Sequence, residues 1–137
     1  MKLIVLDTNV VSELMRPRPN AQVIARLQAF LVLCAPVLYE VRFGIDRLIS
    51  AEPKARLGAA WDGVFAQFGD ERVLPVNAAA ARYAAEVKAS KTGTRDHADV
   101  IDCMIAGVAL AHGAAVATRN TEHFPRERIE IIDPWEV

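Results

Sequence analysis

The chain has 137 residues, of which 53% are hydrophobic and 24% charged, and its formal net charge is −1. This composition excludes a disordered or fibrous chain. A chain of this length can bury enough surface to fold as a single domain over residues 1–137 without disulfides. The near-zero charge excludes a protein that binds nucleic acid through a generally basic surface, so such a partner would have to meet a local basic patch or be recruited by another subunit.

The cysteines and the N-terminal segment indicate where the protein works. Cys34 and Cys103 lie far apart in apolar runs, which predicts buried free thiols and a reducing cytoplasm. The apolar run after Lys2 is interrupted by Asp7, so it is too short for a secretion signal or a membrane span. We therefore expect a cytoplasmic protein with no membrane association.

Hydrophobic patterning predicts strands that alternate with helices. In the first half we expect a strand at 2–6, helices at 8–15 and 23–30, a strand at 31–35, and helices at 37–49 and 53–68. Prolines 17 and 19 end the first helix. Pro36 suits the first turn of the helix at 37–49. A bend is expected near Gly58 or Gly63.

The second half continues the alternation. We expect a strand at 73–76, a helix at 78–89, a polar loop at 90–97, a helix at 98–112, a strand at 114–118, a loop at 120–128 and a last strand at 129–132. Pro75 favours an edge position for its strand. The order predicts a three-layer α/β/α domain with a mostly parallel sheet of four to five strands.

Polar residues follow three of the predicted strands. Asp7 ends the first strand, and Glu40 lies in the first turn of the helix after the second strand. Thr118 and Asn120 follow the strand at 114–118. Sites in parallel sheets form beyond the carboxyl ends of the strands, so these side chains converge on one edge if the strands are neighbours.

Asp102 lies on a predicted helix, at the border of its apolar face. From there a carboxylate can point into a cleft. Asp99, one turn earlier, is expected to be solvated or to pair with Arg95. Each carboxylate alone has a more ordinary explanation, as a helix cap, a partner of the helix dipole or a solvated side chain. Only their joint placement favours a site.

Clustered carboxylates favour a bound cation. Two unit charges about 4 Å apart repel by roughly 4 kcal/mol at an effective dielectric of about 20. Oxygen ligands favour Mg²⁺ or Mn²⁺, and His97, His112 and His123 do not have the spacing of a zinc site. A magnesium ion with open positions can activate water and polarise a phosphate oxygen. Phosphodiester hydrolysis is therefore the expected chemistry.

Five segments carry a resemblance that spans essentially the whole chain. They are LDTNVVSEL at 6–14, EVRFGI at 40–45, DCMIA at 102–106, ATRNTEHF at 117–124 and IDPW at 132–135. As an ordered set they resemble PIN-domain toxins of the VapC type, and among these the FitB-like subgroup.

The resemblance implies a PIN fold and the toxin of a type II toxin–antitoxin system, a Mg²⁺- or Mn²⁺-dependent endoribonuclease. It also implies a homodimer that a small DNA-binding antitoxin neutralises. Asp7, Glu40 and Asp102 would be the metal ligands, Thr118 a site hydroxyl and Asn120 a polar member of the cluster. Asn9 matches the opening motif and would brace Asp7.

One departure from the family pattern affects the number of ions. Many PIN domains have a fourth acidic residue after the strand that ends here at Thr118, but this chain offers Asn120, Glu122 and His123 before Phe124, with no Asp. One tightly bound ion is therefore expected rather than two. RNA backbone contacts are expected from basic residues on loops or element ends, namely Arg16, Arg18, Lys91, Arg95 and Arg119.

Two other functions remain open from the sequence. The chain could be a weakly active or inactive PIN subunit in a DNA-binding regulatory complex with its antitoxin, which the absent fourth acid and the balanced charge favour. It could also be a phosphatase with Asp7 as nucleophile. Such enzymes usually carry a second Asp two residues later, where this chain has Asn9.

Overall fold

The structure is a computed structural model that describes residues 2–27, 30–90 and 97–136. The first half contains β1 (Leu3–Leu6), α1 (Thr8–Leu14), α2 (Ala21–Arg26), β2 (Phe30–Cys34), α3 (Ala35–Asp46) and α4 (Ala51–Phe68). The second half contains η1 (Asp70–Arg72), β3 (Val73–Leu74), α5 (Ala78–Ser90), α6 (His97–His112), β4 (Ala115–Ala117), η2 (Thr121–His123) and β5 (Ile131–Ile132). Lys91, Arg95 and the side chain of Asp99 lie outside the described residues.

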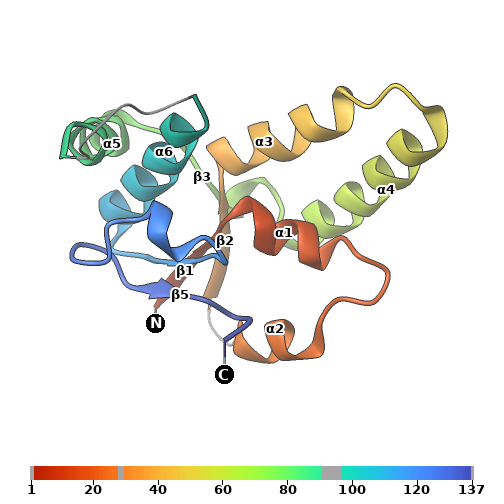
Figure 1. Ribbon diagram of the computed structural model, residues 1–137, viewed down its shortest axis with the longest axis horizontal. Helices are drawn as coiled ribbons and strands as arrows, with labels where there is room; N and C mark the ends of the chain where they lie inside the picture. The colour runs from red at the N-terminus through yellow and green to blue at the C-terminus, as the bar shows by residue number, and fades with distance from the viewer. Residues whose placement is uncertain (1, 28–29, 91–96, 137) are drawn as a thin grey trace.

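The five strands form one parallel sheet in the order β3-β2-β1-β4-β5 (Figure 1). The central strand β1 pairs with β2 on one side and β4 on the other. This confirms the α/β fold and the convergence of the strand ends. The edge position of β3, which ends just before Pro75, confirms the interpretation of that proline.

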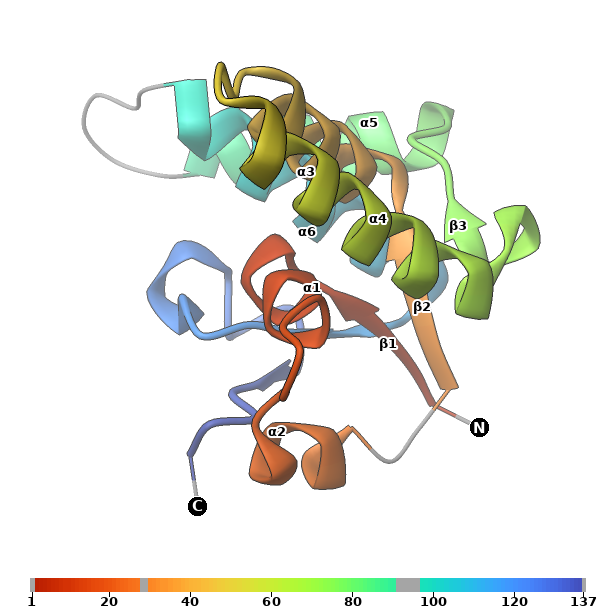
Figure 2. The ribbon, with the colours of Figure 1, turned by 90° about the vertical axis from the view of Figure 1, so that its right-hand side faces the viewer.

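Helices flank the sheet. In Figure 2, helices α3 to α6 lie in the upper part of the molecule and α2 at the bottom, with β1 and β2 between them. Ile4, Val5 and Leu6 of β1 are almost completely buried, as expected for a strand covered on both faces. Cys34 and Cys103 are buried free thiols, as predicted. Within the described residues, no helix has the length and apolar character needed to cross a membrane.

Several predicted boundaries were wrong, and the strands at 73–76 and 114–118 are shorter than expected. Phe30 belongs to β2 and not to the preceding helix, because its backbone pairs with Leu3 and its ring packs against the guanidinium of Arg72. Helix α3 follows β2 directly and begins at Ala35, which moves Glu40 from the first helical turn to the second. The last strand covers only Ile131–Ile132.

Candidate acidic active site

Asp7 is the centre of the site. It is 3% exposed and caps the N-terminus of α1, where its Oδ1 accepts the N–H of Thr8 at 2.7 Å. Its Oδ2 accepts the hydroxyl of Thr118 at 2.7 Å and the amide of Asn9 at 3.3 Å. The β1–β4 pairing continues to this point, since the N–H of Asp7 donates to the carbonyl of Ala117 at 3.0 Å. The sheet itself therefore fixes the carboxylate.

The residues after β4 complete a network around Asp7. The amide of Asn9 also donates to Thr118 Oγ1 at 3.2 Å, and Asn9 Oδ1 accepts the backbone N–H of Arg119 at 3.1 Å. The backbone N–H of Asn120 donates to Thr118 Oγ1 at 2.9 Å. The structure thus brings Thr118 and Asn9 against Asp7, whereas the exposed Asn120 joins the cluster through its backbone.

Glu40 lies beside this network on α3. The hydroxyl of Thr8 donates to Glu40 Oε1 at 2.5 Å. Thr8 therefore connects two carboxylates, giving its backbone N–H to Asp7 and its hydroxyl to Glu40. The strand ends bring these two acids together, as the sequence predicted.

The surroundings make ionisation of both acids costly. Burial raises the pKa of Asp7, and the hydrogen bonds from Thr118, Thr8 and Asn9, together with the charge of His123, lower it only in part. Burial also raises the pKa of Glu40, the Thr8 hydrogen bond lowers it, and the charge of Asp7 raises it further. A nearby cation would relieve both costs, because it stabilises each carboxylate in its charged form.

Asp102 is held by a residue that the sequence analysis did not select. Its Oδ2 lies 3.0 Å from Nδ1 of His123, and its side chain is 16% exposed. His123 ends η2, directly before the buried Phe124, which anchors this turn to the core. The signal in the sequence was the position of His123 in the short polar run after β4.

The donor set is compatible with a hard divalent cation. Within the described part of the chain, no group of three or more histidine, cysteine, aspartate or glutamate side chains is close enough to hold a metal. Mg²⁺ keeps several water ligands and needs only one or two protein carboxylates. The buried, mutually repelling pair of Asp7 and Glu40 meets that need. Cys34 does not add a soft ligand, because burial raises the pKa of its thiol to about 12.

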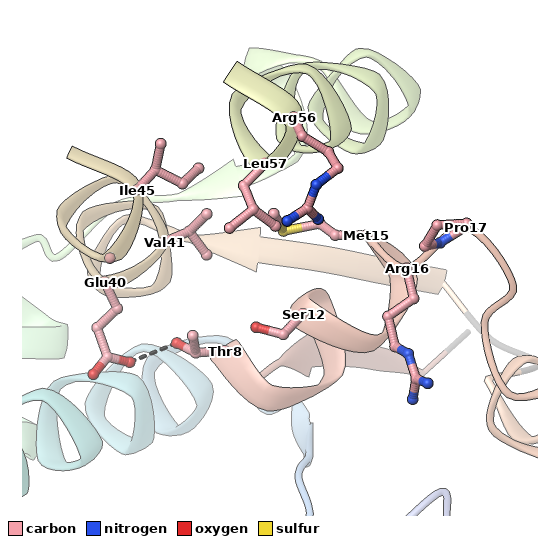
Figure 3. Close-up of a pocket in the computed structure, with 11 residues that line it drawn as sticks. Thr8, Ser12, Met15, Arg16, Pro17, Glu40, Val41, Ile45, Arg56 and Leu57 are labelled. Carbon is pink, nitrogen blue, oxygen red and sulfur yellow. Dashed lines mark hydrogen bonds between the residues drawn. The ribbon is translucent and has the colours of Figure 1, made fainter. Parts of the chain in front are cut away.

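A pocket of about 300 Å³ opens next to Glu40, between α1, α3 and α4 (Figure 3). Thr8 and Glu40 form its acidic end. Ser12 and Arg56 are among its polar lining residues, and the walls are largely apolar, with Met15, Val41, Ile45 and Leu57. The acidic cluster is therefore open to a ligand from this side.

A parallel α/β sheet with acidic residues beyond its central strands is the arrangement of a PIN domain. The PIN domain family matches residues 4–128, and the chain belongs to this family. It is 34% identical to VapC ribonuclease Y4jK from Sinorhizobium fredii (strain NBRC 101917 / NGR234), with 98% of this chain and 99% of the relative covered.

Two further comparisons concern the FitB-like group. The chain is 32% identical to toxin FitB from Neisseria gonorrhoeae (strain ATCC 700825 / FA 1090), with 97% of this chain and 99% of the relative covered. A solved structure of FitAB bound to an IR36 DNA fragment superposes with a TM-score of 0.78 at 29% identity, covering 98% of this chain and 96% of the other. Both agree with the resemblance found in the sequence.

Proposed function

We propose that this chain is the toxin of a toxin–antitoxin pair and a divalent-metal-dependent endoribonuclease. The observation that carries the proposal is the Asp7–Glu40 pair, two acids with raised pKa values joined by Thr8 at the carboxyl edge of the sheet. Membership of the PIN family and a relative named as a ribonuclease support this choice of substrate.

Asp7 and Glu40 would hold the ion, which is Mg²⁺ or Mn²⁺, directly, and Asp102 would bind it through a water molecule. When bound, such an ion lowers the pKa of a water molecule and polarises a phosphate oxygen. The remaining residues orient the carboxylates. Thr118 and Asn9 fix one oxygen of Asp7. The backbone N–H of Thr8 fixes the other oxygen of Asp7, and the Thr8 hydroxyl fixes Glu40. Such bracing keeps the ligands in place before the substrate arrives.

The direct test is cleavage of total RNA with Mg²⁺ or Mn²⁺, followed by mapping of the cut sites. Asp7→Asn should lower cleavage by about 100-fold or more, because changing a residue that only orients a metal ligand costs about 10–100-fold and this change alters a ligand itself. Asp70→Asn is the matched control, since Asp70 is exposed and precedes β3 at the opposite edge of the sheet. EDTA should abolish cleavage. Undiminished cleavage by Asp7→Asn would refute the assignment.

The proposed partners are a small DNA-binding antitoxin and a second copy of this chain. FitAB, a similar complex, has been solved on DNA. The pocket between α1, α3 and α4 offers an apolar surface beside the acidic cluster, which suits an antitoxin helix or extended segment. Helix α4 turns Trp61, Val64 and Phe68 into the core and leaves Leu57 to line the pocket.

A second candidate function is a weakly active or inactive subunit of a DNA-binding regulatory complex. The DNA-bound FitAB structure and the occurrence of His123, not an acid, beside Asp102 favour it. RNA cleavage by the isolated chain separates the two functions. If the chain without its antitoxin leaves RNA intact in Mg²⁺ and in Mn²⁺, the regulatory role is the better account.

A further inference from the structure

Arg119 directly follows Thr118 and has an unusual setting for an exposed arginine. Its guanidinium carbon lies 3.9 Å from the centroid of the Trp135 ring. For comparison, the corresponding distance from Arg82 to Tyr83 is 5.4 Å. The guanidinium is therefore held close against the indole by a cation–π contact, although the residue as a whole is exposed.

The backbone of Trp135, which carries the ring under Arg119, is held by two hydrogen bonds. The backbone N–H of Trp135 donates to Asp133 Oδ1 at 2.9 Å, and its carbonyl accepts the side-chain amide of Gln22 at 2.9 Å. The Trp135 side chain packs partly buried against the hydrophobic core. A partly buried indole on a held backbone limits the side-chain freedom that Arg119 would lose on binding a ligand.

Arg119 is also connected to the acidic centre. Its backbone N–H donates to Asn9 Oδ1, and the amide of Asn9 donates in turn to Asp7 Oδ2. The base of the side chain is therefore held next to the carboxylates, within a network that spans the ends of β1 and β4.

The charge of Arg119 is available for a ligand. Some exposed arginines have carboxylate partners, as Arg42 has in Asp46 and Arg56 in Glu52. Within the described part of the chain, Arg119 makes no ion pair, and its charge is balanced only by an aromatic face. An arginine that stacks on an aromatic ring can still make bidentate hydrogen bonds to a phosphate group.

We propose that Arg119, supported by Trp135, binds a backbone phosphate of the RNA strand at the edge of the acidic site. The inference rests on the proposed ribonuclease function and deepens it. A strand that meets the carboxylates is repelled by them, and a cation on the residue after Thr118 offsets part of that repulsion. Arg119 is a substrate-binding residue in this scheme, and Trp135 is a positioning residue that acts through it.

The test measures binding of a single-stranded RNA to the inactive Asp7→Asn chain over a range of salt concentrations. Adding Arg119→Ala should weaken binding about tenfold and reduce the log–log salt slope by about 0.7, the value for one phosphate contact on a single strand. Arg119→Lys keeps the charge and should keep the slope, while binding weakens about threefold because lysine lacks the planar fork.

Trp135→Leu tests the support. It should leave the salt slope unchanged and weaken binding about threefold, because the charge stays but must be ordered on binding. Trp135→Phe retains an aromatic ring and should recover part of that loss, and it remains informative if Trp135→Leu does not fold. Arg82→Ala is the matched control, an exposed arginine on α5 that also faces an aromatic ring.

In the otherwise unsubstituted chain, Arg119→Ala should raise KM for RNA more than it lowers kcat. An unchanged affinity and salt slope in Arg119→Ala, or an equal loss in Arg82→Ala, would overturn the inference. If the parent chain cleaves RNA normally in either case, the proposed function stands and only the role of Arg119 falls. If the parent chain neither binds nor cleaves RNA, both proposals fail together.

Discussion

Asp7 has two roles that the sequence presented as alternatives. Its side chain caps α1 by accepting the N–H of Thr8, and the same carboxylate is the buried centre of the acidic cluster. The cap fixes one oxygen, and Thr118 and Asn9 fix the other. A helix-capping aspartate can therefore also serve as a metal ligand, because the hydrogen bonds that make it a cap also hold its carboxylate in one position.

The raised pKa of Asp7 predicts how stability depends on pH in the metal-free protein. An acid with a higher pKa in the folded than in the unfolded chain stabilises the fold when protonated. That stabilising contribution is complete at a pH below 3.8, the pKa of Asp7 in the unfolded chain. It is lost as the pH rises through the higher pKa of Asp7 in the folded chain. At neutral pH, burial of the charged Asp7 therefore reduces the free energy of unfolding.

Asp7→Asn should remove this cost and keep the helix cap, because Asn is as good a cap as Asp. In EDTA at neutral pH the variant should melt at a higher temperature than the parent chain, with the difference shrinking as the pH approaches 4. Thermal unfolding followed by circular dichroism measures this. A variant that melts lower than the parent at neutral pH would show that ionised Asp7 stabilises the fold.

At the scale of elements, the position of Asp102 depends on how closely α6 packs on α5. A Cβ atom added to Gly107 would lie 2.3 Å from the carbonyl oxygen of Ala80 and 2.8 Å from the backbone nitrogen of Ala84. Both atoms belong to α5 and cannot move without shifting that helix. Gly107 therefore allows the close contact that sets α6, and with it Asp102, against the sheet.

Gly107→Ala should lower the free energy of unfolding by about 1–3 kcal/mol or more, the usual cost of overpacking. Gly63→Ala on α4 is the matched control, because nothing lies within 4 Å of the added Cβ. Alanine in that exposed helical position should raise stability by about 0.5–1 kcal/mol. Urea unfolding of both variants measures the difference, and equal stabilities would contradict the close α5–α6 contact.

At the scale of the whole molecule, the sequence predicted the strands and their common edge because buried parallel strands are short continuous apolar runs. It could not place Asp102, because a helical residue is located by packing between helices and not by strand order. The contact with His123 was missed for the same reason, since it joins α6 to η2 across the fold. The start of β2 at Phe30 could not be predicted either, because it depends on pairing with Leu3 in the folded chain.

The central claim is that one cation held at the Asp7–Glu40 edge drives RNA cleavage. The most direct measurement is the rate of RNA cleavage as a function of Mn²⁺ concentration, for the parent chain and for Asp7→Asn. We predict a saturable dependence on a single ion in the parent chain, no rate in EDTA, and loss of the response in Asp7→Asn. Cleavage that persists in EDTA, or a response to Mn²⁺ that is the same in both chains, would contradict the claim.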